Sequence, residues 1–422
     1  MKLTKYKLGE ILELQRGYDL PSSQMKVGNI LVAGSNGVIG YHNEARSNHP
    51  CITVGRSGSV GKVHYYEQAT WAHNTALFVK DFKGNNPQYL YYFLKNLHLD
   101  KMFVKGSSVV PSLDRKVVHS LIVPFHRDIA CQKSISSILS NIDRKIELNR
   151  AINQNLEAMA KQLYDYWFVQ FDFPNEEGEP YKLSGGKMVW NEKLKREIPE
   201  GWNVMSINEI CTSCRGVSYG KDDLLSNGSG VLVLRGNNID NNHIVYDSNV
   251  AFVPYNFVSK EQHIKAGDII MTMSSGSKAH VGKCAMFHKD SEHTFGAFLS
   301  KFTPKKELRY MTFLFLTSGY FKSLITAFCN GTGINNLTNQ IFDDVLLVLP
   351  DEKKTRLFES KVSGLFAMIG NNEENMRILT KQRDELLPLL MNGQVSVNSD
   401  LSASGEKERK NLLLNQKHFL HI

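Results

Sequence analysis

The pattern of apolar positions predicts two long helices, one in the middle of the chain and one near its end. Apolar residues recur at alternating steps of three and four, a spacing that places them on one narrow stripe of a helix that packs against another helix. The stripe positions are Ile135, Ile138, Ile142, Lys145, Asn149, Ile152, Leu156, Met159 and Leu163 in one run, and Val362, Leu365, Ile369, Asn372, Met376, Leu379, Arg383, Leu386 and Leu390 in the other. We therefore predict spacer helices within residues 125–173 and 351–395.

Two helices of equal length in one chain would pair antiparallel if the two globular segments sit at opposite ends, and we predict this pairing inside one chain. The stripe contains Lys145, Asn149, Asn372 and Arg383, and polar residues at such positions weaken a coiled coil but fix its register and partner. Two alternatives stay open. Each helix could pack on its own domain, or both could join a larger homo-oligomeric bundle.

Each predicted helix follows a globular segment that ends in an apolar, β-rich run with a proline, at residues 121–124 and 346–350. In these segments short β-like runs alternate with Gly, Asn and Ser turns. We predict a mixed α+β protein with pseudo-twofold symmetry, in which two similar α/β domains, 1–124 (the first head) and 203–350 (the second head), each precede a long helix. Residues 174–202 read as a polar connector, and 396–422 as a tail of unknown role.

The two heads repeat each other in sequence as well as in layout. Arg16-Gly17 matches Arg215-Gly216, and the Gly-Ser turn that begins at Arg56 matches the one that begins at Ser274. The skeleton repeats while the side chains in the turns differ. One scaffold with two different tips suits two related but non-identical ligands, although an old duplication without functional symmetry would leave the same trace.

Composition narrows the class of protein without naming it. The chain has 422 residues, 42% of them hydrophobic, a formal charge of +8 and six cysteines. These values fit a reduced, cytoplasmic protein of two or three domains, and no apolar stretch is long enough for a membrane span. The charge is compatible with nucleic acid as a partner but does not establish one.

The sequence offers binding side chains rather than a catalytic constellation. The Gly-rich turns that end in Gly61-Lys62 and Gly282-Lys283 resemble phosphate loops, but their spacing and the residue after Lys do not fit. Neither a catalytic triad nor a metal-ligand spacing is evident, and Cys211 and Cys214 lack the second pair of ligands that a zinc site needs. We expect no metal site, no cofactor and no enzymatic activity in this chain.

The turns instead gather side chains that read base edges, such as Arg, Asn and Ser, together with lysines that hold phosphates. For any one residue, a solvated turn side chain is the simpler explanation, so the set carries the prediction. The candidate DNA-contacting residues are Arg16, Arg56, Ser57, Lys62, Lys105, Ser107 and Arg115 in the first head, and Arg215, Tyr219, Arg235, Asn237, Ser275, Lys278, Lys283, Thr332 and Asn335 in the second.

Together these features resemble the specificity (S) subunit of type I restriction–modification systems, over residues 1 to about 395. The resemblance rests on the repeated Arg-Gly, the paired Gly-Ser turns and the proline-terminated strands before the helices. The segments Ile146-Glu147-Leu148-Asn149-Arg150 and Tyr164-Asp165-Tyr166-Trp167-Phe168-Val169 also resemble the central helical region of that family. The tail beyond about Ser396 departs from the pattern.

The resemblance implies that each head reads one half of a bipartite site in double-stranded DNA, while the helices set the spacing and dock methyltransferase subunits. S-adenosylmethionine, ATP and Mg²⁺ would then be bound by the methyltransferase and restriction subunits of a cytoplasmic bacterial or archaeal complex. The alternative is a coiled-coil adaptor that assembles other proteins without touching DNA. A methyltransferase fused to its own recognition domain would need a cofactor loop and an Asn/Asp-Pro-Pro-aromatic sequence, and neither is found.

Overall fold

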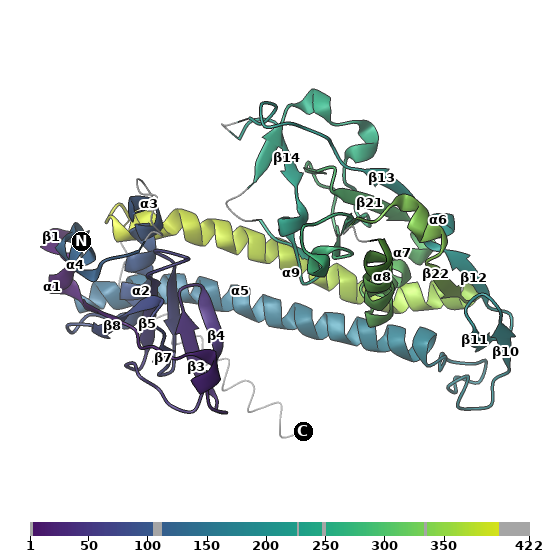
Figure 1. Ribbon diagram of the computed structural model, residues 1–422, viewed down its shortest axis with the longest axis horizontal. Helices are drawn as coiled ribbons and strands as arrows, with labels where there is room; N and C mark the ends of the chain where they lie inside the picture. The colour runs from purple at the N-terminus through teal and green to yellow at the C-terminus, as the bar shows by residue number, and fades with distance from the viewer. Residues whose placement is uncertain (1–2, 104–111, 226–227, 247–249, 333–335, 396–422) are drawn as a thin grey trace, which may run out of the picture. The chain divides into compact units, whose positions relative to one another are not determined.

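The computed structural model describes residues 3–103, 112–225, 228–246, 250–332 and 336–395. The chain forms two compact units: unit 1 contains Met1–Leu148 and Met376–Ile422, and unit 2 contains Asn149–Asn375. Each unit holds one head and one half of each long helix. These helices are α5 (Ile129–Tyr164) and α9 (Glu352–Met391), drawn in blue and yellow-green in Figure 1.

The first head consists of small sheets whose central strands are apolar. Its elements are β1 (Thr4–Lys7), α1 (Leu8–Ile11), β2 (Glu13–Arg16), β3 (Ile30–Gly34), β4 (Gly37–His42), β5 (Cys51–Gly55), β6 (Val63–Tyr66), β7 (Trp71–Ala72), β8 (Ala76–Asp81), α2 (Pro87–Asn96), α3 (Leu99–Phe103), α4 (Arg115–Ser120) and β9 (Ile122–Phe125). One sheet has the order β2-β8-β5-β6 and another the order β4-β3-β7. Every residue of β5 is buried, including Thr53, so this strand lies in the core of the first head.

The second head repeats this layout with insertions. Its elements are β12 (Asn203–Ser206), α6 (Ile207–Ile210), β13 (Cys211–Arg215), β14 (Val231–Leu234), β15 (Ile239–Asp240), β16 (His243–Ile244), β17 (Ala251–Val253), β18 (Ile269–Thr272), β19 (Cys284–Met286), β20 (Thr294–Phe295), β21 (Leu299–Pro304), α7 (Arg309–Leu316), α8 (Gly319–Thr332) and β22 (Leu346–Leu349). The sheet orders β13-β21-β18-β19 and β17-β14-β20 correspond to those of the first head.

Each head is closed by pairing its first strand with its last. In the first head β1 pairs antiparallel with β9, with Thr4 opposite Phe125. In the second head β12 pairs antiparallel with β22, with Asn203 opposite Leu349. Because the last strand leads directly into a long helix, each head starts and ends at the base of that helix. The predicted mixed α/β class, with two similar heads that each precede a long helix, is confirmed.

The long helices pair within each unit. In unit 2 the side-chain amide of Asn153 in α5 donates to the carbonyl of Ile369 (3.3 Å), and Asn372 donates to Oδ1 of Asn153 (2.8 Å). Farther along α5, Tyr164 packs against Phe358, which comes earlier in α9. The two helices therefore run antiparallel. In unit 1 the guanidinium of Arg383 in α9 donates to Asp143 in α5 at 2.8 Å.

The buried stripe of α5 differs from the predicted one at every second position. Leu139, Ile146, Asn153 and Ala160 are buried, each one residue after a predicted stripe position. Lys145 is exposed and Met159 is 55% exposed. A stripe that steps by three and then four residues shares every other position with one that steps by four and then three. The apolar pattern alone therefore does not decide which of the two stripes is buried.

The shared stripe positions and most of the α9 stripe do face protein. The buried apolar members of the predicted stripes are Ile135, Leu156, Val362, Ile369 and Leu390, and the half-buried apolar members are Ile138, Ile142, Ile152, Leu163, Leu365, Met376, Leu379 and Leu386.

The segment predicted as a polar connector is more ordered than its composition suggests. It contains a hairpin of β10 (Met188–Asn191) and β11 (Arg196–Pro199), and Trp202 at its end packs on Phe173 with ring centroids 4.6 Å apart. Before it, α5 passes into a π-helical turn, Asp165–Val169, which buries Trp167 and Phe168. Aromatic packing in unit 2 therefore holds a stretch whose surface is polar.

In the described part of the chain, no single helix has both the length and the apolar character to cross a membrane. By length and composition only, the segments Lys306–Leu316 and Gly319–Cys329 pass as a pair bent by 67°.

Candidate nucleic-acid interface

Both heads hold a turn with the same set of backbone hydrogen bonds. In the first head the amides of Arg56 and Ser57 donate to the carbonyl of Thr75, at 2.9 and 3.1 Å. In the second head the amides of Met273 and Ser274 donate to the carbonyl of Phe298, at 2.9 and 3.2 Å. The turn between β7 and β8 is thus equivalent to the turn between β20 and β21.

This equivalence corrects the alignment of the two heads. The sequence suggested that Arg56 corresponds to Ser274, whereas the backbone bonds place Arg56 opposite Met273 and Ser57 opposite Ser274. The side chain of Met273 is fully buried. The loop from Ser274 to Gly282 is longer than the loop from Ser57 to Gly61. Aligning the Gly-Ser pairs of the two sequences therefore shifts the register.

The repeated Arg-Gly packs directly against each turn. The amide of Gly17 donates to Ala76 (3.0 Å), and the amide of Gly216 donates to Leu299 (3.2 Å). A Cβ on Gly17 would lie 2.1 Å from the carbonyl oxygen of His73, and a Cβ on Gly216 would lie 2.2 Å from that of Gly296. Only glycine allows this approach, which gives a physical reason for the dipeptide in both heads.

In each head a third segment of the chain hydrogen-bonds to the residues that contact the turn. Leu113 donates its amide to Arg56 (2.9 Å), and Leu337 donates to Met273 (2.7 Å). Two turn clusters result. We define the first turn cluster as residues 16–18, 56–57, 73–75 and 112–113, and the second as residues 215–217, 273–274, 296–298 and 336–337.

The candidate residues of the first head that the structure describes are Arg16, Arg56, Ser57, Lys62 and Arg115, and the first three belong to the first turn cluster. Arg16 is exposed, with a guanidinium nitrogen 3.6 Å from Asp19, and Arg56 and Ser57 are half-buried. Lys62 donates to the side chain of Asn36 at 2.8 Å. Arg115 is exposed at the first position of α4, two residues after Leu113.

In the second head, each candidate arginine is held in place by hydrogen bonds to the protein. Arg215 donates to the carbonyls of Ala297 (3.2 Å) and Leu337 (3.1 Å), so its guanidinium braces the second turn cluster. Arg235 donates to the hydroxyl of Tyr219 at 3.0 Å. Both arginines are thus pre-positioned, but two of the N–H donor groups of Arg215 already bind backbone carbonyls of the same head.

The remaining candidates of the second head occupy surrounding loops. Asn237 and Lys278 are exposed on the 3₁₀ turns Gly236–Asn238 and Lys278–His280. Ser275 accepts the amide of Ser277 (3.3 Å), and Nζ of Lys283 lies 3.8 Å from Asp240. Thr332 is the last residue of α8. Lys105, Ser107 and Asn335 lie outside the described residues.

Sequence reasoning missed an exposed aromatic member of the second turn cluster. Phe298 is 71% exposed at the turn between β20 and β21. In the sequence it stands in Ala297-Phe298-Leu299, directly before the buried strand β21, and so reads as core. Its exposure follows from the turn geometry, which no residue pattern announced.

A charged contact ties the second head to both long helices in unit 2. His243, in β16, places Nε2 2.9 Å from Glu157 of α5 and Nδ1 2.8 Å from Glu373 of α9. Burial lowers the pKa of His243, but the hydrogen bonds and charges of the two carboxylates outweigh it and raise the pKa to about 10. The imidazole is therefore a cation that bridges two anions. We call these three residues the His243 bridge.

The first head has its own polar contact with both helices in unit 1. The hydroxyl of Tyr92 in α2 donates to Asp143 of α5 at 2.6 Å, and Asp143 also accepts from Arg383 of α9. Burial, together with the neighbouring Asp143, holds the pKa of Tyr92 above its ordinary value. Tyr92 thus contacts α5 directly and is linked to α9 through Asp143.

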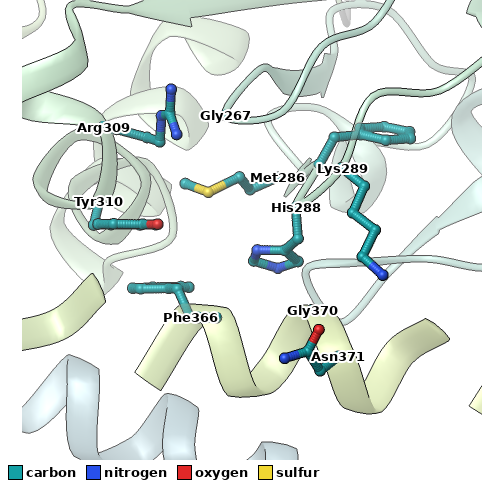
Figure 2. Close-up of a pocket in the computed structure, with 11 residues that line it drawn as sticks. Gly267, Met286, His288, Lys289, Arg309, Tyr310, Phe366, Gly370 and Asn371 are labelled. Carbon is teal, nitrogen blue, oxygen red and sulfur yellow. The ribbon is translucent and has the colours of Figure 1, made fainter. Parts of the chain in front are cut away.

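A hollow of about 200 Å³ lies between the second head and α9, and Figure 2 shows side chains that line it. Tyr310 stacks on Phe366 there, with centroids 4.6 Å apart. Close by, Glu359 of α9 accepts the amides of Tyr310 (3.2 Å) and Met311 (2.8 Å) at the start of α7, and burial raises its pKa to about 7. The hollow is thus a packing seam of head on helix, and its lining residues differ from those of the turn clusters.

The described residues contain no group of three or more His, Cys, Asp or Glu side chains placed to hold a metal ion. The turn clusters expose polar side chains, such as those of Arg16, Arg215 and Asn336, on a braced backbone, an arrangement suited to binding.

Comparisons with known proteins agree with this arrangement. A family model described as the type I restriction modification DNA specificity domain matches residues 2–158 and 199–376. The specificity subunit of the type I restriction enzyme EcoKI from Escherichia coli (strain K12) is 31% identical over 209 residues, which cover 47% of this chain and 44% of that protein. This chain therefore matches less than half the length of that relative.

Two further comparisons extend over more of the chain. The specificity subunit of the type I restriction enzyme MjaIX from Methanocaldococcus jannaschii is 26% identical over 330 residues, or 74% of this chain and 69% of that protein. The crystal structure of a type I restriction–modification S subunit from M. genitalium aligns with a TM-score of 0.55 and 16% identity, covering 94% of this chain and 97% of that one. At this identity the likeness concerns the fold.

Proposed function

Because the chain belongs to the type I restriction modification DNA specificity domain family, we propose that it is the sequence-reading subunit of a type I restriction–modification complex. Each head reads one half of a bipartite target in double-stranded DNA through its turn cluster. The long helices set the distance between the halves and dock the methyltransferase subunits.

The observation that carries this proposal is the pair of turn clusters. They share their backbone hydrogen bonds but differ in side chains, with Arg56 and Thr75 in one where Met273 and Phe298 stand in the other. A common frame with different tips suits two half-sites of related geometry and different sequence. Phosphate contacts fix register on a duplex, and base-edge contacts specify sequence, so arginines and serines on rigid turns suit the second task.

The proposal divides the chemistry among subunits. Methylation requires the target base to leave the stack and enter a pocket beside S-adenosylmethionine, and we assign that pocket to a methyltransferase partner. ATP hydrolysis and cleavage, with their Mg²⁺, belong to restriction subunits. This chain then supplies recognition and spacing in the cytoplasm of a bacterium or archaeon.

The test is methylated-base mapping of the host genome with and without the gene. We expect a bipartite motif to lose its methylation when the gene is removed. Replacing residues 1–124 with the equivalent segment of a relative should change one half of the motif and leave the other intact. If both halves changed together, the heads would not read independently.

A coiled-coil adaptor without DNA contact would behave differently. It would tolerate Arg56→Ala and Arg235→Ala with no change in the methylated motif. A base-reading arginine should instead relax one position, at a cost of about 1–3 kcal/mol.

A further inference from the structure

Phe298 is an exposed aromatic side chain that the fold of the second head does not bury. Single exposed apolar residues are common on proteins, so the exposure of Phe298 alone decides nothing. Its position does, because the residue stands at the turn around which the second turn cluster is built.

The backbone beneath Phe298 is fixed on both sides. Its carbonyl accepts two amides, from Met273 and Ser274, and Arg215 binds the carbonyl of the preceding residue, Ala297. The following residue, Leu299, is fully buried in β21. The phenyl ring is thus presented by a rigid support, and a partner that meets it incurs little cost in backbone ordering.

The first head shows that this turn does not require an aromatic residue. Thr75 occupies the equivalent position, with the same two amides donating to its carbonyl. Its hydroxyl lies 2.9 Å from Nδ1 of His73, so it satisfies its polar group locally. An exposed phenyl in place of a hydroxyl is therefore a feature of the second head's surface chemistry and not of its folding.

A phenyl ring cannot donate or accept a conventional hydrogen bond, so it selects an apolar group. In the major groove of DNA, the 5-methyl group of thymine is the apolar feature of the base edges. We propose that Phe298 contacts the 5-methyl group of a thymine in the half-site read by the second head and thereby specifies that base pair. This inference rests on the proposed function.

The experiment uses the full chain, co-expressed with its methyltransferase subunits, and duplexes carrying the mapped target. Each thymine of the second half-site is replaced in turn by deoxyuridine, which lacks only the methyl group. We expect one position where the wild type binds deoxyuridine about fourfold more weakly, the factor expected for one methyl-sized apolar contact. Phe298→Ala should weaken binding to the thymine duplex and show no further loss with deoxyuridine.

Two variants control for general damage. Phe298→Leu keeps an apolar side chain and should retain part of the thymine preference. Tyr255, in the same head, is 74% exposed, and Tyr255→Ala should keep the wild-type preference. Thermal unfolding of each variant checks that the head stays folded.

Other outcomes overturn the inference. An unchanged thymine preference in Phe298→Ala would reject the contact. So would an equal loss at every duplex together with lower 2-aminopurine fluorescence than the wild type induces, since that indicates a wedge between base steps. Loss of co-purifying methyltransferase with unchanged sequence preference would assign Phe298 to a protein interface. If the wild type did not distinguish target from scrambled DNA, the proposed function itself would fail.

Discussion

Arg16 and Arg215 hold the same place in the two heads but make different contacts. Arg215 donates to two backbone carbonyls of the second turn cluster, whereas Arg16 has an exposed contact with Asp19. We predict that Arg215→Ala lowers the free energy of unfolding by about 1–2 kcal/mol, because two charge-assisted hydrogen bonds are lost. Urea unfolding of the two alanine variants measures the difference.

Arg16→Ala is the matched control and should change the stability by less than about 0.5 kcal/mol, as expected for an exposed ion pair. Equal effects of the two substitutions would contradict the bracing role of Arg215. If Arg215 also read a base, its loss would relax one position of the motif in addition to destabilising the head.

At this scale the sequence indicated which residues gather, but not what each one does. The repeated Arg-Gly and Gly-Ser segments located both turns, since close backbone approach demands glycine. The contacts of Arg215 and the exposure of Phe298 depend on how three distant segments meet. Residue types in order along the chain do not encode that meeting directly.

Among the elements, α5 offers a direct test of its buried stripe. Met159 is 55% exposed, while the next residue, Ala160, is fully buried. We predict that Met159→Glu changes stability by less than about 0.5 kcal/mol, whereas Ala160→Glu costs more than about 3 kcal/mol because it buries an unpaired charge. Circular-dichroism melting distinguishes the two. If Met159→Glu destabilised the protein more than Ala160→Glu, the buried stripe of α5 would be the one predicted from the heptad pattern.

The His243 bridge makes the stability of unit 2 depend on pH. The pKa of His243 is raised from 6.5 to about 10 in the folded protein, so folding favours proton binding between these values. Its stabilisation is complete below pH 6.5 and is lost as pH rises through about 10. We predict that the free energy of unfolding of the wild type falls by about 1–2 kcal/mol more than that of His243→Gln between pH 6 and pH 10.

Melting temperatures across this range provide the measurement, and exposed His280 provides the control substitution. His280→Gln should keep the wild-type pH dependence. Identical slopes for wild type and His243→Gln would show that His243 is not a stabilising cation. Neighbouring His288, whose Nε2 lies 3.8 Å from Glu373, has a pKa lowered by burial and so does not replace His243 in this role.

The existence of the two long helices was predictable from the sequence, whereas which of their residues are buried and how they pack was not. The spacing of apolar residues predicted α5 and α9 because a stripe at steps of three and four, sustained over many turns, is typical of a long helix. The buried Asn153 was missed because a polar residue lowers the apolar signal even where its amide is satisfied by Ile369 and Asn372. The hairpin in the polar connector and the packing of Trp202 on Phe173 were not predicted, because a few aromatic residues contribute little to a mostly polar pattern.

For the whole molecule, the proposed spacing role predicts the effect of shortening both helices together. Deleting Lys145–Ala151 and Met376–Gln382 removes one heptad from each helix and leaves Asp143, Arg383, Asn153 and Asn372 in place. Seven helical residues span roughly 10 Å, or about three base-pair steps. We expect both half-sites to be retained with a spacer changed by about three base pairs.

Methylated-base mapping of cells that carry the double deletion gives the result. Deleting Lys145–Ala151 alone is the control and should abolish recognition, since it breaks the pairing between α5 and α9. An unchanged spacer in the double deletion would show that the helices do not set the distance.

The discontinuity of unit 1 has a consequence for synthesis on the ribosome. Its core contains Leu387, Leu390 and Met391 beside residues such as Leu8 and Leu139, whereas unit 2 is one continuous stretch, Asn149–Asn375. The emerging chain can therefore complete unit 2 first, while unit 1, which begins to appear earlier, waits for the end of α9 to bury its core. During that interval the exposed apolar surface of the first head is the part of the nascent protein most in need of a chaperone.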